Sequence, residues 1–160
     1  MPRGQKTIEK RRLAPDPVYG STLLSKFINN VMEDGKKTVA QQNVYNALDI
    51  LKEKGMDPLA TFEKALDTIA PKQEVRPKRV GGAAYQVPME VRGARKISLS
   101  IRWLLDATRK KPNSEFKTFS QKLAAEIISA LNNEGEAIRK RDSVHKMADA
   151  NRAFAHFRFN

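Results

Sequence analysis

The sequence predicts a mainly α-helical single domain of about six helices, with a protruding two-stranded β-hairpin between the third and fourth helices. Three observations support this fold class. A chain of 160 residues fits one domain and is long enough to bury a core. Apolar residues recur at helical spacing along most of the chain. That spacing changes to alternation on either side of Gly81-Gly82, a pair typical of a tight hairpin turn.

Three helices are predicted before the hairpin, each with a clear end signal. The first carries an i, i+3, i+4 stripe and ends at Gly35. The second runs from about residue 37 and ends at Gly55. The third begins at Asp57-Pro58, an N-cap residue followed by proline at the first helical position, and it stops at Pro71.

Residues 73–91 predict the hairpin. Pro77 and Pro88 cannot lie in a central strand, so both strands are expected to be edges. Arms of about eight residues would reach about 25 Å at ~3.3 Å per residue. Basic residues dominate the first strand, and apolar residues are few. We therefore expect a ribbon that protrudes, with packing flat on the helices as the alternative.

Three more helices are predicted after the hairpin. The fourth spans about 93–110, with Ile97 on its buried face and Trp103 off that face. The fifth is marked by an apolar series from Phe116 to residue 131. The sixth starts near residue 136 and is expected to be amphipathic and half exposed, because its apolar face is thin.

The two ends of the chain differ from this helical region. The predicted organisation is a basic extended arm over 1–20, a helical domain over 21–150 that carries the hairpin, and an aromatic, basic tail over 151–160. Phe154 is expected to tether the tail to the helical core. For Phe157 and Phe159, tethering and stacking on unpaired bases are equally good interpretations.

The charge indicates a polyanionic partner. Thirty Lys and Arg residues against 18 Asp and Glu give a formal net charge of +12. The excess is concentrated in segments 1–12, 72–96, 109–122 and 139–146, which suggests several contact patches. Nucleic acid is the first candidate partner, and an anionic membrane surface is the second.

Several classes of function are excluded or disfavoured. The chain has no cysteine, which removes disulfides, thiolate metal sites and thiol nucleophiles. It has no apolar run of the ~20 residues that a membrane span needs and no secretory signal, so a cytosolic location is expected. Ser143 near His145 lacks a third catalytic partner. Gly35-Lys36-Lys37 lacks the P-loop spacing. No catalytic residue, metal site or cofactor is therefore predicted.

Four motifs resemble a known family. They are Pro15-Asp-Pro-Val-Tyr19, Asp34-Gly-Lys-Lys37, the hairpin segment 75–91 and the segment His145-Lys-Met-Ala-Asp-Ala-Asn-Arg-Ala-Phe-Ala-His156. In order and spacing they are similar to the bacterial-type small-subunit ribosomal protein number seven, and the resemblance covers almost the whole chain. It implies six helices with a β-ribbon arm after the third.

The resemblance also implies a function and partners. These are primary binding to the 3′ major domain of small-subunit ribosomal RNA and assembly of the head of that subunit. The ribbon would lie near the exit-site transfer RNA and the messenger RNA path. Neighbouring ribosomal proteins of the head and platform, number eleven among them, would be protein partners, and no membrane would be involved. The location would be a cytoplasmic or organellar ribosome.

The resemblance further implies which residues face nucleic acid. The RNA-binding residues would be Arg3, Lys6, Lys10, Arg11, Arg12, Lys36, Lys37, Arg76, Lys78, Arg79, Arg92, Arg95, Lys96, Arg109, Lys110 and Lys111. The residues near transfer RNA would be Gly81, Gly82, Tyr85, Arg141 and His145. Two departures from the family pattern are a missing proline in 92–96 and Phe157-Arg-Phe-Asn160 in place of Tyr-Arg-Trp.

Two other functions compete with this interpretation. An architectural protein that binds duplex DNA would also combine helices with a basic β-arm, and would usually dimerise through an exposed apolar helix face. An RNA-processing enzyme would need a catalytic cluster. Preference for folded ribosomal RNA over duplex DNA separates the first two functions, and turnover of RNA would indicate the third.

Overall fold

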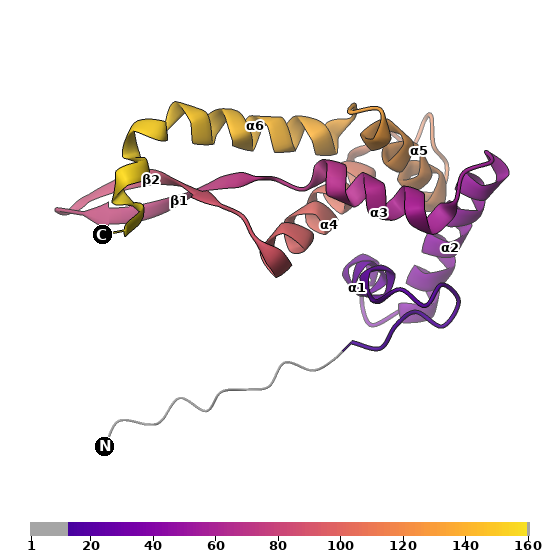
Figure 1. The fold of residues 1–160 in the computed structure, drawn as a ribbon. Coiled ribbons are helices and arrows are strands. Elements are labelled where there is room, and N and C mark those ends of the chain that lie inside the picture. The colour runs from indigo at the N-terminus through magenta and orange to yellow at the C-terminus, as the bar shows by residue number, and fades with distance from the viewer. Residues whose placement is uncertain (1–12, 160) are drawn as a thin grey trace, which may run out of the picture.

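The computed structural model describes residues 13–159 and confirms the mainly helical fold, with the hairpin between the third and fourth helices (Figure 1). The elements in chain order are α1 Thr22–Val31, α2 Lys37–Glu53, α3 Pro58–Ile69, β1 Gln73–Val80, β2 Ala83–Glu90, α4 Gly93–Lys110, α5 Phe119–Leu131, α6 Glu136–Ala150 and the 3₁₀ helix η1 Arg152–Phe159. Helices α1–α5 form a compact body. The hairpin and α6 leave that body in the same direction (Figure 1).

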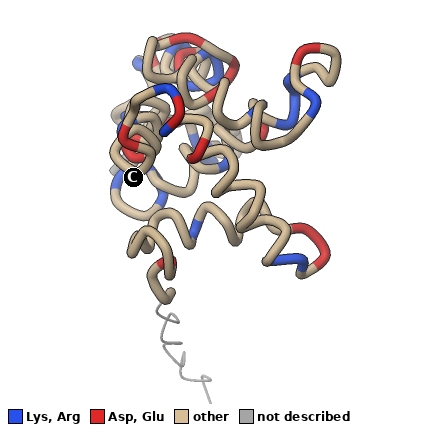
Figure 2. The backbone as a smooth tube through the Cα atoms, turned by 90° about the vertical axis from the view of Figure 1, so that its right-hand side faces the viewer, with Lys and Arg blue, Asp and Glu red and all other residues tan. Residues whose placement is uncertain are grey.

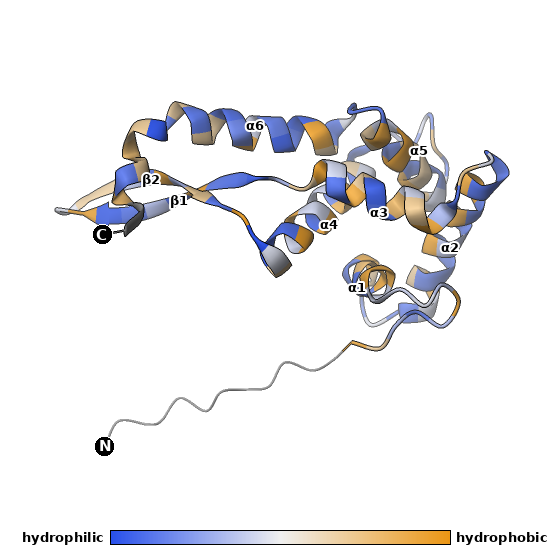
Figure 3. Ribbon diagram, in the orientation of Figure 1, coloured by the Kyte–Doolittle hydropathy of each residue, from blue (hydrophilic) through white to orange (hydrophobic). Residues whose placement is uncertain are grey.

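Most of the core lies among α1–α5, whose helices all carry hydrophobic residues (Figure 3), and α6 adds Ala137, Ile138 and Val144 to it. Phe27 of α1 and Phe62 of α3 are fully buried, with ring centroids 5.1 Å apart in an edge-to-face arrangement. Helix α4 packs on α1, α3 and α5 and also on α6. Because α4 is covered from several sides, the prediction that Trp103 lies off the buried face is wrong: this residue is only 7% exposed. Ile97, predicted to be buried, is 38% exposed.

Local capping interactions fix where several helices begin. The Asp57 side chain accepts the backbone N–H of Ala60, as the Asp-Pro signal predicts for α3. Helix α5 begins later than predicted, because Thr118 and Gln121 form a reciprocal capping box at its start. Phe116 therefore precedes the helix, and Lys111 lies over its ring with 5.5 Å between Nζ and the centroid.

The segment before α1 contains a turn at residues 17–19, whereas the sequence predicted an extended arm over 1–20. The buried Asp16 carboxylate accepts the backbone N–H groups of Val18 and Tyr19, each at 3.1 Å. It also accepts the hydroxyl of Tyr45 on α2 at 2.7 Å. These bonds attach the segment to the helical body. The rest of the arm lies outside the described residues.

The hairpin has the predicted strand length and turn. Its eight-residue strands pair without a bulge from Gln73 opposite Glu90 to Val80 opposite Ala83. Gly81 and Gly82 have φ of 58° and 88°, the left-handed conformations that a type I′ turn requires. The ribbon protrudes from the body, but it is not freestanding, because α6 and η1 pack along it (Figure 1).

The tail closes on the hairpin through aromatic rings. Tyr85 of β2 lies 5.3 Å from Phe154 and 5.0 Å from Phe157, measured between ring centroids. Lys78 of β1 donates to the backbone oxygen of Phe157 at 2.9 Å. Phe154 and Phe157 thus tether the tail, but to the hairpin, whereas the prediction placed Phe154 on the helical core. The side chain of Phe159 lies outside the described residues.

A buried carboxylate determines the start of α6. Glu126 of α5 is fully buried, and its Oε1 accepts the backbone N–H of Ala137 at 3.1 Å. Its Oε2 forms an ion pair with Lys111 Nζ at 2.9 Å. The N-cap residue Gly135 has no side chain to cap the helix, so Glu126 supplies the acceptor. Gly135 has φ +94°, and a Cβ there would lie 2.7 Å from Glu126 Oε1, so only glycine fits.

Replacing Glu126 with Ala is expected to lower the free energy of unfolding by about 3–5 kcal/mol, because it leaves Lys111 unpaired and the Ala137 N–H unsatisfied. Urea denaturation measures this difference. The exposed Glu134→Ala variant is the control and should change stability by less than about 0.5 kcal/mol. Equal stability of the two variants would contradict the capping role of Glu126.

Tyr45 should titrate later than an ordinary tyrosine. Partial burial and the hydrogen bond to Asp16 raise the pKa of Tyr45 to about 12. Because folding favours the neutral phenol, this contribution to stability is complete below pH ~10 and is lost as the pH rises toward 12. Absorbance at 295 nm should show a late tyrosine step that Tyr45→Phe abolishes. A late step that persists in that variant would assign it to another tyrosine.

Candidate nucleic-acid interface

The predicted basic residues fall into groups at the α1–α2 loop, on the hairpin and its root, and at the end of α4. Arg3, Lys6, Lys10, Arg11 and Arg12 lie outside the described residues. At the opposite end of the molecule from the hairpin tip, acidic and basic residues are interspersed (Figure 2). That end therefore lacks the one-sided charge expected of a surface that binds a polyanion.

The loop group is mixed in charge. Lys36 and Arg109 line the same hollow of about 270 Å³ together with Glu33 and Asp34. Arg109 pairs with Glu33, and Lys36 Nζ lies 3.8 Å from Asp34. Lys37 begins α2 and is exposed. The structure thus brings Lys36 and Arg109 together, although they are far apart in the sequence.

The root of the hairpin holds two arginines on one buried carboxylate. Glu74 of β1 is 7% exposed. Its Oε1 accepts from Arg76 of the same strand, and its Oε2 accepts from Arg95 of the first turn of α4. Burial alone would raise the pKa of Glu74, but the hydrogen bonds and charges of Arg95 and Arg76 outweigh it and lower this pKa. The carboxylate is therefore ionised at neutral pH.

Other basic residues surround this cluster. Arg92 pairs with Glu90 at the end of β2. Arg79 and Lys96 form no ion pair within residues 13–159, and Arg79 is exposed near the turn. Lys78 is half-buried and bonded to the tail. The hairpin therefore offers guanidinium groups at its root and near its turn, while Lys78 is held by its contact with the tail.

The residues predicted to lie near transfer RNA occupy two separate places. Gly81 and Gly82 form the turn, and Tyr85 packs against the tail near it. Arg141 and His145 lie at the other end of the ribbon: Arg141 Nη1 donates to the Thr68 oxygen at 2.7 Å, and His145 Nε2 accepts the Lys72 N–H at 3.0 Å. The last two side chains tie α6 to the end of α3 and to the residue before β1.

The end of α4 separates two neighbouring lysines. Lys110 is exposed, whereas Lys111 is paired with the buried Glu126 and its side chain is only 18% exposed. Lys111 therefore has a structural role that the sequence analysis missed. No local signal could reveal this role, because its partner belongs to α5.

The structure adds a cleft that the sequence analysis did not identify. It lies between α4 and α6, has a volume of about 480 Å³ and is walled by more basic than acidic side chains. Its lining includes Arg102, Trp103, Asp106, Lys110, Glu136, Arg139, Lys140 and Ser143. Arg102, Arg139 and Lys140 were not among the predicted contacts. Arg139 and Lys140 lie in the basic segment 139–146 that the sequence singled out. The sequence could not predict that α4 faces this segment.

The described part of the structure also bears on metal sites and membrane-spanning helices. Within residues 13–159, no group of three or more His, Asp or Glu side chains is placed to hold a metal ion. No helix in the same part of the chain is long and apolar enough to cross a membrane. The cleft and the hairpin offer Arg and Lys side chains, which are donors suited to phosphate oxygens.

Comparison with known proteins gives extensive matches. The sequence profile of the family described as "Ribosomal protein S7p/S5e" matches residues 2–152. The "Small ribosomal subunit protein uS7" of Thermoanaerobacter sp. strain X514 is 55% identical over 153 residues, covering 95% of this chain and 96% of that protein. The protein of the same name from Alcanivorax borkumensis is 52% identical over 160 residues, covering 99% of this chain and all of that protein.

Proposed function

This chain belongs to the ribosomal protein S7p/S5e family and is a non-enzymatic, structural constituent of the small ribosomal subunit; on that premise we propose that it binds folded ribosomal RNA through the α4–α6 cleft and the hairpin. The observation that carries the proposal is the position of these two features: α6 forms one wall of the cleft and also packs along the hairpin.

The chemistry of these surfaces favours RNA. Lys and Arg side chains that bind RNA phosphates release counterions from the RNA, so the affinity depends on the salt concentration. Double-stranded RNA is recognised mostly by its shape and backbone, so a rigid surface that combines a groove and a ribbon suits it. Among the described residues, the large exposed apolar side chains lie in four different parts of the chain: Leu13 and Val18 before α1, Val39 in α2, Ile97 in α4 and Met147 in α6. This scatter gives little support to the dimeric DNA-binding alternative.

The resemblance noted above refines the proposal. The RNA is the 3′ major domain of small-subunit ribosomal RNA, and the protein organises the head of the subunit. The hairpin turn lies near the exit-site transfer RNA and the messenger RNA path, and a platform protein, number eleven, is a neighbour. Segments 1–20, 21–150 and 151–160 act as a basic arm, an RNA-binding domain and a tail. Of the sixteen predicted basic residues, fifteen are proposed contacts, and Lys111 acts through the position of α6 because it pairs with the buried Glu126.

A competition titration tests this function. At physiological salt, the purified chain should bind a 3′-domain ribosomal RNA fragment and keep it in the presence of an equal mass of duplex DNA. Shape recognition is the reason, because charge alone would not distinguish the two polyanions. Equal affinity for both would favour the architectural DNA-binding function. Turnover of the RNA would contradict the non-enzymatic assignment.

The contribution of the hairpin to RNA binding can be measured from the salt dependence of the affinity. Arg76→Ala combined with Arg79→Ala should weaken RNA binding and reduce the slope of log K against log salt by about 1.4–1.8, the amount expected for two lost phosphate contacts. The matched control replaces Lys52 and Lys54, two exposed lysines at the end of α2, with Ala. Identical slopes for both double variants would remove the hairpin from the interface.

A further inference from the structure

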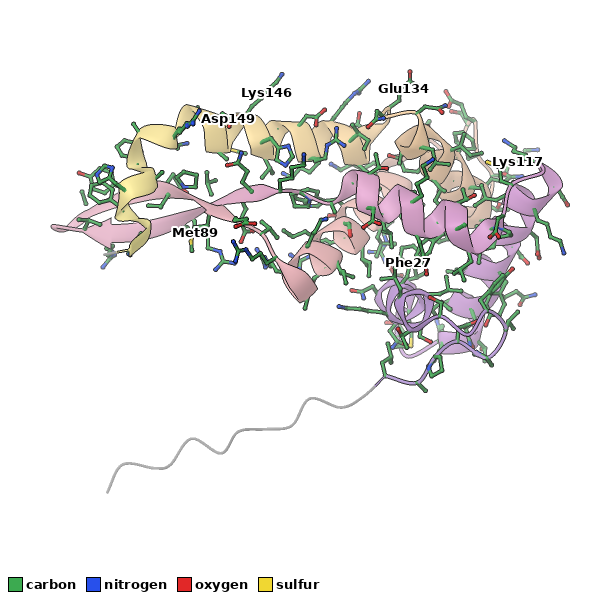
Figure 4. The ribbon with its side chains drawn as sticks, in the orientation of Figure 1. Phe27, Met89, Lys117, Glu134, Lys146 and Asp149 are labelled. Atoms are coloured by element: carbon green, nitrogen blue, oxygen red, sulfur yellow. The ribbon has the colours of Figure 1, made fainter. Side chains whose placement is uncertain are left out.

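The cluster of Glu74, Arg76 and Arg95 has features that a surface ion pair lacks. Its carboxylate is buried, yet the side chains of Arg76 and Arg95 are 53% and 49% exposed. The two arginines belong to different elements, β1 and the first turn of α4. Glu74 itself lies directly across the hairpin from Met89, which is labelled in Figure 4. One inward carboxylate therefore fixes two outward guanidinium groups.

We propose that Glu74 is a positioning residue. It holds the guanidinium groups of Arg76 and Arg95 in a preorganised binding site for one phosphodiester group of the bound RNA. This proposal rests on the function proposed above and specifies the chemistry of one part of that surface. Glu74 does not touch the RNA in this account. It acts through the two arginines.

The hydrogen-bond geometry supports this role. Arg76 presents Nε and Nη2 to Oε1, at 2.7 and 2.6 Å. Arg95 presents the same two atoms to Oε2, at 3.3 and 2.9 Å. Both arginines thus use the same edge toward Glu74. Each guanidinium has five N–H donors, so each retains donors, including both on Nη1, for another acceptor.

The charge of the cluster also fits a phosphodiester. Two guanidinium groups and one carboxylate leave a net charge of one positive unit, which matches the single negative charge of a backbone phosphate. Arginine binds phosphate oxygens through a planar fork, so its orientation matters as well as its charge. Because each guanidinium is already held in place before RNA binds, less side-chain entropy is lost on binding.

The proposal predicts a result opposite in sign to simple electrostatics. Glu74→Gln removes one negative charge and so raises the formal net charge above +12, which should tighten binding to a polyanion if charge alone decides. If Glu74 positions the arginines, this variant should instead bind the 3′-domain RNA fragment about tenfold more weakly, equivalent to about 1.4 kcal/mol. The matched control is Glu53→Gln, an exposed residue with the same change of charge, which should bind as tightly as the unmodified chain or slightly more so.

Two further variants separate positioning from an effect on folding. Arg95→Lys keeps the net charge but replaces the planar guanidinium with an ammonium group. This variant should bind the RNA more weakly, whereas an interface that depends on charge alone would show no change in affinity. In a chain that already carries Arg76→Ala and Arg95→Ala, Glu74→Gln should cause no further weakening, because no guanidinium remains to be positioned. Continued weakening in that background would show that Glu74 acts through the stability of the hairpin, and would overturn the proposal.

The outcomes distinguish this proposal from the broader one. If the unmodified chain shows no preference for RNA over duplex DNA, the proposed function fails. If that preference holds but Glu74→Gln binds as tightly as Glu53→Gln, only the positioning role of Glu74 fails. Thermal unfolding of each variant confirms that the compared proteins are folded under the conditions of the titration.

Discussion

The rest of the structure depends on the two interactions made by the buried carboxylate of Glu126. It caps α6 at Ala137 and binds Lys111, so it joins the end of α4, the middle of α5 and the start of α6. A two-stranded ribbon is marginal by itself. Here Arg141 and His145 of α6 bond to the residues that lead into the ribbon, and η1 packs on β2. The direction of α6 therefore affects both the cleft and the hairpin.

Two buried glutamates show why counting charges cannot define the interface. Glu126 pairs with Lys111 inside the protein and withdraws that lysine from the surface. Glu74 pairs with Arg76 and Arg95 but leaves both half exposed. The first glutamate uses a basic residue to build the fold. The second orients basic residues that remain accessible to a partner.

The sequence predicted those elements whose signals are local. Gly81-Gly82 located the hairpin, and Asp57-Pro58 located the start of α3, because turn and cap chemistry depends on adjacent residues. The burial of Trp103 was missed because α4 packs on several helices, whereas periodicity assumes one buried face. The cleft between α4 and α6 was missed because its walls are more than 25 residues apart in the chain. The phosphate-binding roles of individual residues remain predictions.

Directed hydroxyl-radical cleavage of the RNA tests the central claim most directly. The chain has no cysteine, so Ser143→Cys in the cleft, Ala84→Cys on the hairpin and Glu53→Cys at the end of α2 each give one attachment point for an iron chelate. All three positions are exposed. The account predicts strong cleavage of the 3′-domain RNA from positions 143 and 84 and little from position 53. Strong cleavage from position 53 with none from the other two would contradict it.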